Sequence, residues 1–329
     1  MEQFLGVLEA RVTKFALPVL PGGFVLFKEF HQPSSAQEAV GLRHNLLRAA
    51  YLGGGTILNA LDYEKMVPEE FRAECLVSLE SLPVRQIELT SEELVIGAMV
   101  THQEMLESEQ VFPVLKEIVG QMRNRNIRNM ATVGGNIALR SSNGNISVGL
   151  LAMDANIEIM LPQCEASSAG EVLENSGQAQ PGKINVCRKV LSLAQYLEGV
   201  ETVPGLKEAL ILKVHIPRAI GEMRFATRCY RRTANDVSIL SADVLVKGTA
   251  GHIEDIRLAM GGIARHAARL TDIENMLLEQ GLPKDRDELV SAIRPLLHTV
   301  SDVRGSAEFK REVGAQIAAW SVYKALGQI

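Results

Sequence analysis

The sequence predicts an α+β fold built from more than one unit, and three observations indicate this class. The chain has 329 residues, more than a usual single domain, so two or three subdomains are expected. Short apolar runs alternate with helical patterns as far as Pro217. Beyond Pro217 the strand-like runs come first and the helical patterns follow, which is typical of a separate α+β domain.

The composition is that of a folded, mildly acidic protein. Hydrophobic residues make up 47% of the chain and charged residues 22%, which excludes a largely disordered chain. An aromatic content of 5% and a formal net charge of -5 disfavour nucleic-acid binding by base stacking or by a basic surface. The N-terminus lacks a basic signal region and the apolar run at 146–160 is too short to span a bilayer, so we expect a cytoplasmic protein.

The four cysteines, Cys75, Cys164, Cys187 and Cys229, lie far apart and form no C-x-x-C pair. This spacing excludes a zinc or iron–sulfur site of the usual kinds within the chain. Cys164 and Cys187 flank a polar segment and could pair, but a cytosolic chain keeps its thiols reduced. We therefore expect four free thiols.

The N-terminal part of the chain predicts an extension followed by a first unit. Residues 1–23 contain a Pro- and Gly-rich run that precedes the first regular pattern. Ser34 or Ser35 can cap a helix over 36–47, and a short apolar strand follows at 49–52.

The middle of the chain carries four further strand patterns and two helical ones. Thr101 and Glu104 match the capping box that opens a helix. A segment at 163–182, rich in Ser, Gly, Glu and Gln, is interpreted as a surface insertion. The strand patterns lie at 76–79, 94–98, 156–160 and 183–186, and the second helical pattern lies at 113–123.

The last unit is predicted to start after an alternating run that ends at Pro217. It carries three strand patterns and then three helical patterns. The strands are expected at 225–230, 236–247 and 253–260, and the helices at 271–280, 286–297 and 307–326.

Two glycine motifs carry the strongest functional signal. Each follows an apolar stretch and offers consecutive N–H groups that could form a nest for phosphate oxygens, with a threonine hydroxyl beside them. A single glycine run is usually only a turn, but a pair could hold the two phosphates of a dinucleotide from opposite sides. Neither a Rossmann pattern nor a P-loop is present. The motifs are Leu52-Gly53-Gly54-Gly55-Thr56-Ile57 and Ala131-Thr132-Val133-Gly134-Gly135-Asn136.

The second motif belongs to a longer stretch, residues 123–138, with a specific resemblance. It resembles a flavin-binding loop of the FAD-binding subunits of molybdenum hydroxylases, the family of xanthine dehydrogenase and carbon monoxide dehydrogenase. Residues 53–56 stand where that family has its first flavin loop. The resemblance extends over residues 24–329, with further similar stretches at 96–102, 150–155, 231–237 and 302–313.

The resemblance implies both a fold and a task. The fold is a PCMH-type FAD-binding domain over 24–217, in which two small α/β subdomains (about 24–85 and 86–217) clasp an extended FAD. A C-terminal domain over 218–329 has a three-stranded sheet and helices. In the family, FAD receives electrons from two [2Fe-2S] clusters, fed by a molybdenum cofactor, and passes them to NAD or another acceptor. This chain resembles the middle subunit of a heterotrimer with an iron–sulfur subunit and a molybdopterin-binding subunit.

By position, the resemblance implies cofactor-binding residues and no catalytic residue, because the cofactor carries the redox chemistry. Asn145 stands where the family has an acidic residue, and an amide is the weaker acceptor. Arg228 stands where the family has a lysine near the flavin ring, and Arg231 with Arg232 is usually structural but could favour the reduced ring. The implied residues are Leu52, Gly53, Gly54, Gly55, Thr56, Ile57, Thr101, Thr132, Val133, Gly134, Gly135, Asn136, Asn145, Met153 and Arg228.

Three other interpretations stay open. One is a self-contained FAD-dependent reductase of the same cofactor fold, and another is a flavin-free scaffold subunit, which the two departures from the family pattern favour. The third is an α/β protein with two ordinary glycine turns. The basic cluster Arg123, Arg125 and Arg128 is either a solvated face or a contact for a partner or a phosphate, and His102 is interpreted as a packing residue.

Overall fold

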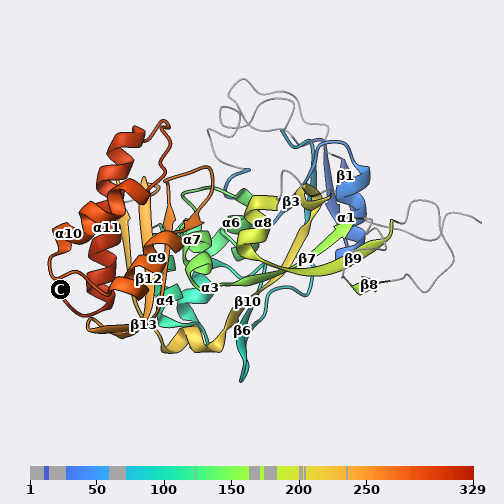
Figure 1. The fold of residues 1–329 in the computed structure, drawn as a ribbon. Coiled ribbons are helices and arrows are strands. Elements are labelled where there is room, and N and C mark those ends of the chain that lie inside the picture. Colours follow the sequence, from blue (N-terminus) through green and yellow to red (C-terminus); the bar gives the residue numbers. More distant parts are fainter. Residues whose placement is uncertain are drawn as a thin grey trace, which may run out of the picture.

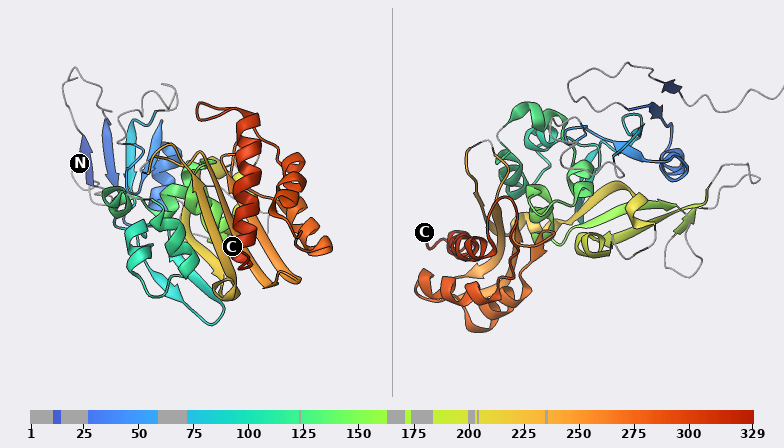
Figure 2. Two further views of the ribbon diagram at one scale, coloured as in Figure 1. Left: turned by 90° about the vertical axis from the view of Figure 1, so that its left-hand side faces the viewer. Right: turned by 90° about the horizontal axis from the view of Figure 1, so that it is seen from above.

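The computed structural model contains three β-sheets with helices packed around them (Figure 1). The first sheet and the C-terminal sheet lie on opposite sides of the molecule, and the second sheet lies with its helices between them (Figures 1 and 2). The structure describes residues 11–14, 27–58, 72–122, 124–162, 171–173, 184–199, 203, 205–234 and 236–329.

The first sheet has the strand order β1-β2-β4-β3. Its central strand β4 runs parallel to both neighbours, β2 and β3, and helix α1 (Ala36–Asn45) connects those two. Ser35 caps α1, because its side chain accepts a hydrogen bond from the Glu38 N–H, as the sequence predicts. The strands are β1 (Arg11–Lys14), β2 (Glu29–Gln32), β3 (Ala49–Leu52) and β4 (Cys75–Ser78). Strand β1 therefore lies within the predicted extension and adds an antiparallel edge to this sheet.

The second sheet is antiparallel throughout, with the order β5-β6-β10-β7-β9-β8. Its two faces serve two cores: Ile157 and Ile159 belong to the largest core, whereas Met160 and Leu212 pack with Val40 of α1. Of the predicted insertion at 163–182 only β8 is described, and it pairs with β9. The strands are β5 (Ile87–Leu89), β6 (Glu93–Gly97), β7 (Asn156–Pro162), β8 (Glu171–Leu173), β9 (Val186–Ser192) and β10 (Leu210–Pro217).

Short helices cover the face of this sheet that carries the largest core. Thr101 caps α3 in the predicted capping box, since Glu104 reaches back to the Thr101 N–H. The helices are α3 (His102–Glu107), α4 (Pro113–Gly120), α6 (Val133–Leu139), α7 (Asn145–Ala152) and α8 (Leu193–Gly199). Helix α5 (Arg125–Met130) lies beside α3 and has no buried residue.

The C-terminal unit consists of an antiparallel sheet, β11-β12-β13-β14, with helices packed against it. The three predicted strands are present, and the two-residue β14 (Ala268–Arg269) adds a short fourth. The longest helix, α11 (Ala307–Ala325), packs against β11 and β12. The remaining elements are β11 (Arg224–Tyr230), β12 (Leu240–Thr249), β13 (His252–Gly261), α9 (Thr271–Gln280) and α10 (Arg286–Ile293), and the 3-10 turns are Leu206–Glu208, Arg218–Glu222 and Arg294–Leu296.

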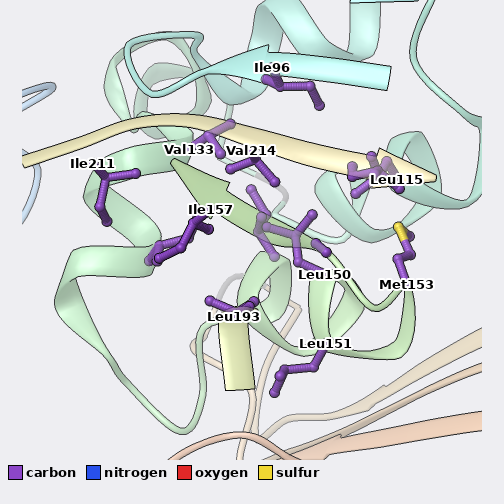
Figure 3. Packing of buried hydrophobic residues seen from close by; sticks show 14 of the residues in the cluster. Ile96, Leu115, Val133, Leu150, Leu151, Met153, Ile157, Leu193, Ile211 and Val214 are labelled. Atoms are coloured by element: carbon purple, nitrogen blue, oxygen red, sulfur yellow. The ribbon is translucent and has the colours of Figure 1, made fainter. Parts of the chain in front are cut away.

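Helix α7 joins the second sheet to the C-terminal sheet. Every residue after Asn145 in this helix is buried, which a helix achieves only when it is covered on all sides. Leu150 lies toward β7 and β10, whereas Leu151 lies on the side of the C-terminal strands (Figure 3). At Gly149 an added Cβ would lie 2.4 Å from Ile118 Cδ1, so the Ile118 side chain of α4 packs directly against the backbone of α7.

Asp154 ties the end of this helix to the C-terminal unit. Its Oδ2 lies 2.9 Å from Nη1 of Arg257, and its other oxygen pairs with Arg269. Arg269 also pairs with the buried Glu274, whose Oε1 accepts the Leu258 N–H at 2.7 Å. The network therefore links α7 with β13, β14 and α9.

The cysteines differ from expectation at one position. Cys75 and Cys229 are free thiols, but Cys187 is disulfide-bonded, so the expectation of four free thiols is wrong for Cys187. That expectation came from an assumed compartment, whereas pairing depends on which sulfur atoms the fold brings together. Cys164 lies outside the described residues. Within the described part of the chain, no helix is long and apolar enough to cross a membrane.

Asp243 is a buried acid in the contact between α7 and β12. Its side chain is 2% exposed, and burial raises its pKa to about 7, although a hydrogen bond with Thr227 opposes the shift. In the unfolded chain the same carboxyl has an ordinary pKa near 3.8. Between these two values the folded state binds more protons than the unfolded state, so stability falls as the pH rises.

We predict that Asp243→Asn removes this pH dependence. The free energy of unfolding of the wild type should decrease between pH 4 and pH 7 by on the order of 4 kcal/mol, relative to the variant. Urea denaturation at several pH values measures the difference, with Asp272→Asn on the exposed side of α9 as the control. Parallel pH profiles for wild type and Asp243→Asn would contradict a buried, protonated Asp243.

Candidate functional site

A cavity of about 580 Å³ opens where the three units meet, a size typical of small-molecule sites. Its walls come from the end of β3, from the segment between α4 and α7, and from the turn between β11 and β12. Nine of the residues that the sequence implied as cofactor-binding line it: Gly53, Gly54, Gly55, Thr56, Ile57, Thr132, Gly135, Asn136 and Asn145.

The first glycine motif forms an open turn at one wall of this cavity. Gly55 has a φ of 66°, the left-handed conformation that glycine adopts without strain. The N–H groups of Gly53, Gly54, Gly55 and Thr56 donate no hydrogen bond to any described residue. A cluster of free N–H groups at a cavity is a binding place for an anion such as a phosphate.

The second glycine motif is not a loop, contrary to expectation. Thr132 is the N-cap of α6, and its hydroxyl accepts the Gly135 N–H at 3.1 Å. The N–H groups of Val133 and Gly134 donate to the carbonyls of Val100 and Ala98, at 3.0 and 2.8 Å. These N–H groups are therefore not free donors, because the first turn of α6 and the carbonyls of Ala98 and Val100, just after β6, already satisfy them.

The glycines of the two motifs bring their backbones together. A Cβ built on Gly54 would lie 1.5 Å from the carbonyl oxygen of Met130, and one on Gly53 would lie 2.9 Å from Thr132 Oγ1. Gly134 packs in the same way on Ala98, where an added Cβ would lie 2.7 Å from the Ala98 Cβ. Gly53 and Gly54 therefore let the β3 turn lie against the segment between α5 and α6, whereas Gly134 lets α6 lie against the chain just after β6.

The third wall comes from the C-terminal unit and is polar. Ser238 donates its hydroxyl to Oδ1 of Asn145 at 3.1 Å, and its carbonyl accepts from Nδ2 of the buried Asn143 at 2.6 Å. The Gly262 N–H donates to the Ser142 carbonyl at 2.8 Å nearby. Asn145 thus sits at the cavity with its amide held by the other unit.

The three arginines near this wall have different environments. Arg231 lines the cavity, and its guanidinium donates to the Gln121 carbonyl at 2.6 Å and to Ser238 Oγ at 3.2 Å. Arg232 is exposed and pairs with Asp236 at 2.9 Å. Arg228 does not line the cavity, because its guanidinium stacks on the ring of Trp320 in α11, 4.3 Å from the centroid.

The remaining predicted residues lie behind the cavity wall or away from it. Thr101 is buried as the cap of α3, and Met153 lies in the core beside Leu115 (Figure 3). In the basic cluster, Arg128 bonds to Gln103 and to the Met122 carbonyl, while Arg123 lies outside the described residues. The predicted residues that do not line the cavity are Leu52, Thr101, Val133, Gly134, Met153 and Arg228.

Sequence reasoning missed several residues that the cavity gathers. Tyr51 lines it with its hydroxyl fixed to the Glu208 carbonyl at 2.9 Å, and Gln121, Asn143 and Ser238 form its polar end. No local pattern distinguishes these residues, because they meet only when distant segments fold together. They share no sequence motif with the glycine turns.

His102 lines the cavity but is fully buried. Burial lowers its pKa to about 4, so the imidazole is neutral at neutral pH, and its Nδ1 lies 3.4 Å from Sδ of Met122. A buried, neutral histidine fits the packing role that the sequence predicts. Among the described residues no group of three or more His, Cys, Asp or Glu side chains could hold a metal ion.

The cavity chemistry fits FAD: free N–H donors suit a pyrophosphate, and amides, a hydroxyl and a cation suit a polar ring edge. The comparisons agree. Residues 26–171 match the family described as "FAD binding domain in molybdopterin dehydrogenase", and residues 225–325 match the family described as "CO dehydrogenase flavoprotein C-terminal domain".

Individual relatives match most of the chain. The carbon monoxide dehydrogenase medium chain of Hydrogenophaga pseudoflava is 23% identical over 306 residues, covering 89% of this chain and 97% of that protein. The xanthine dehydrogenase FAD-binding subunit of Escherichia coli O157:H7 is 25% identical over 293 residues, covering 86% and 91%. A solved structure of carbon monoxide dehydrogenase from Hydrogenophaga pseudoflava shares the fold, with a TM-score of 0.75 at 21% identity over 93% of this chain and 99% of that chain.

Two family matches in the expected order, full-length relatives and a shared fold lead to one conclusion. The chain belongs to the family of FAD-binding medium subunits of molybdenum hydroxylases, which includes carbon monoxide dehydrogenase medium chains and xanthine dehydrogenase FAD-binding subunits.

Proposed function

We propose that this chain binds FAD in the 580 Å³ cavity and passes electrons through it, from iron–sulfur clusters on a partner subunit to NAD or another acceptor, in the cytoplasm. One observation carries the proposal: the turn at 53–56 presents four N–H groups without partners among the described residues, at a cavity closed by two other units. FAD, when bound, supplies the redox chemistry, and the protein supplies binding, orientation and electrostatics.

Each wall has its own part in this proposal. The N–H groups of Gly53, Gly54 and Gly55 bind the pyrophosphate, and Thr132 and Asn136 border the same region from α6. Asn145 accepts or donates one hydrogen bond to the cofactor, with its orientation fixed by Ser238. Proton transfer by a side chain is not required of this subunit, which agrees with a neutral, buried His102.

The proposed partners follow from the family. The molybdenum cofactor and the two [2Fe-2S] clusters reside on a molybdopterin-binding subunit and an iron–sulfur subunit, which with this chain form a heterotrimer. The names of the relatives support this arrangement, since several are medium chains or subunits of dehydrogenases. A flavin-free scaffold is the second candidate, because the stacking of Arg228 on Trp320 removes the cation expected near the ring.

The visible absorption spectrum of the purified chain, with chromatography of the heat-released cofactor, separates the two candidates. We expect flavin bands and about one FAD per chain, since residues of both glycine motifs line one and the same cavity. A colourless protein that also takes up no added FAD would overturn the proposed function and favour the scaffold.

We predict that Gly54→Ala strongly weakens FAD binding. The new Cβ would lie 1.5 Å from the Met130 carbonyl oxygen, so the β3 turn has to move away from the segment between α5 and α6. Such overpacking costs about 1–3 kcal/mol, enough to weaken binding roughly tenfold or more. Fluorescence titration with FAD measures the dissociation constant. Gly251→Ala is the matched control, because nothing lies within 4 Å of its added Cβ, and equal affinities for both variants would contradict the prediction.

We predict that Thr132→Val weakens the protein and its cofactor binding together, whereas Thr132→Ser preserves both. The hydroxyl caps α6 and accepts the Gly135 N–H at the cavity, and losing such a cap costs about 1 kcal/mol. Urea denaturation gives the stability and the FAD titration gives the affinity. If the valine variant kept both values, Thr132 would have no part in the site.

A further inference from the structure

Arg231 is a cation at the cavity without a carboxylate partner among the described residues. Its guanidinium is half-buried and makes its hydrogen bonds to neutral groups, the carbonyl and side chain of Gln121 and the Ser238 hydroxyl. Among the described residues that line the cavity it is the one lysine or arginine. A partly buried cation that is not neutralised attracts negative charge strongly, because solvent screens it weakly.

The position of this cation is fixed by its neighbours. The Gln121 carbonyl accepts from Nη1 at 2.6 Å and its Oε1 lies 3.4 Å from Nη2. The Gln121 side chain is held in turn, because its Nε2 donates to Thr227 Oγ1 and its Oε1 accepts from Cys229 Sγ. Arg231 therefore has little freedom to turn away from the cavity.

The other charges nearby do not cancel it. Asp236 also lines the cavity, but its carboxylate is bound by Arg232, whose charge offsets it. His102 is neutral, and Arg228 lies outside the cavity on Trp320. A net positive charge thus remains at the polar end, where Asn143, Asn145 and Ser238 also lie.

We propose that Arg231 contacts the ring system of bound FAD and raises its reduction potential. The inference rests on the proposed function, in which FAD occupies this cavity. The polar end suits the edge of the ring that carries carbonyl and N–H groups, because amides and a hydroxyl can match both kinds of group. The pyrophosphate has its own donors on the other wall, in the turn at 53–56.

The effect on the potential follows from charge. Two electrons and one proton convert the neutral oxidised ring into a monoanion, so a fixed cation stabilises the reduced form more than the oxidised form. The electrons come from the donor named in the proposed function, and the proton comes from solvent. Arg231, and not Arg228, then supplies the positive charge that tunes this cofactor.

The test compares Arg231→Met with Arg231→Lys in the FAD-loaded chain. We expect the methionine variant to lose about tenfold more affinity for reduced than for oxidised FAD, equivalent to a fall of about 30 mV for a two-electron couple. The lysine variant should keep most of the wild-type potential, because it keeps the charge. Spectroelectrochemical titration gives the potential, and FAD titration gives the affinity of the oxidised form.

Two variants at positions outside the cavity serve as controls. Arg228→Met, whose guanidinium lies on Trp320 outside the cavity, and Lys247→Met, at an exposed position of β12, should leave the potential unchanged. If Arg231→Met does not fold, Arg231→Gln takes its place, since an amide still donates to Gln121 or Ser238. If Arg231→Met lost equal affinity for oxidised and reduced FAD, Arg231 would contact the phosphates and not the ring, and the inference would be overturned. An unchanged reduction potential in this variant would also overturn it. If the wild-type chain binds no FAD, the proposed function itself fails.

Discussion

The burial of α7 between two sheets is the constraint on which the rest of the structure depends. Its residues from Ile146 to Ala152 are all buried, and neither the second sheet nor the C-terminal sheet covers the helix alone. Each of its larger apolar side chains contributes about 1.5–3 kcal/mol only when both sides are covered. The fold is therefore one cooperative arrangement across α7, although it contains three sheets.

The position of α7 determines where the walls of the cavity lie. Asn145 begins α7 at the cavity, and Asp154 follows its end in a pair of salt bridges with Arg257 and Arg269. The bonds of Ser238 to Asn143 and Asn145 then fix the C-terminal wall against the turn before α7. The polar end of the site is thus positioned by contacts between units, and the glycine end by backbone contacts between β3 and the α5–α6 segment.

Much of this arrangement could be predicted from local sequence. Ser35 and Thr101 cap the helices that their patterns indicate, and α9 and α11 begin at the predicted residues, because capping and apolar spacing are local signals. The glycine motif at 134–135 led to the wrong prediction of a loop, because that prediction also used only local sequence. Glycine favours a loop locally, whereas here it permits a helix to pack closely on Ala98.

The site itself was predictable only in part. The first motif lines the cavity as the family resemblance implied, but Arg228 and Met153 do not, because stacking on Trp320 and packing in the core decide where those side chains lie. No sequence pattern marks Gln121 or Ser238 as site residues, because each acts through a partner that is distant in the chain. Gln121 bonds to Arg231, 110 residues away, and Ser238 bonds to Asn145, 93 residues away. Contacts of this kind depend on the tertiary fold.

The burial of α7 also changes what counts as a module in this protein. Two separate family matches, at 26–171 and 225–325, suggest two exchangeable pieces joined by a linker. Yet α7 lies in the first match and is completed by strands of the second, so each piece alone leaves a large apolar face in water. Recombination that brought in a C-terminal piece from a distant relative would have to carry matching changes along α7. The two matched regions therefore evolve as one unit. A substitution on one side of α7 has to remain compatible with the residues that pack on its other side.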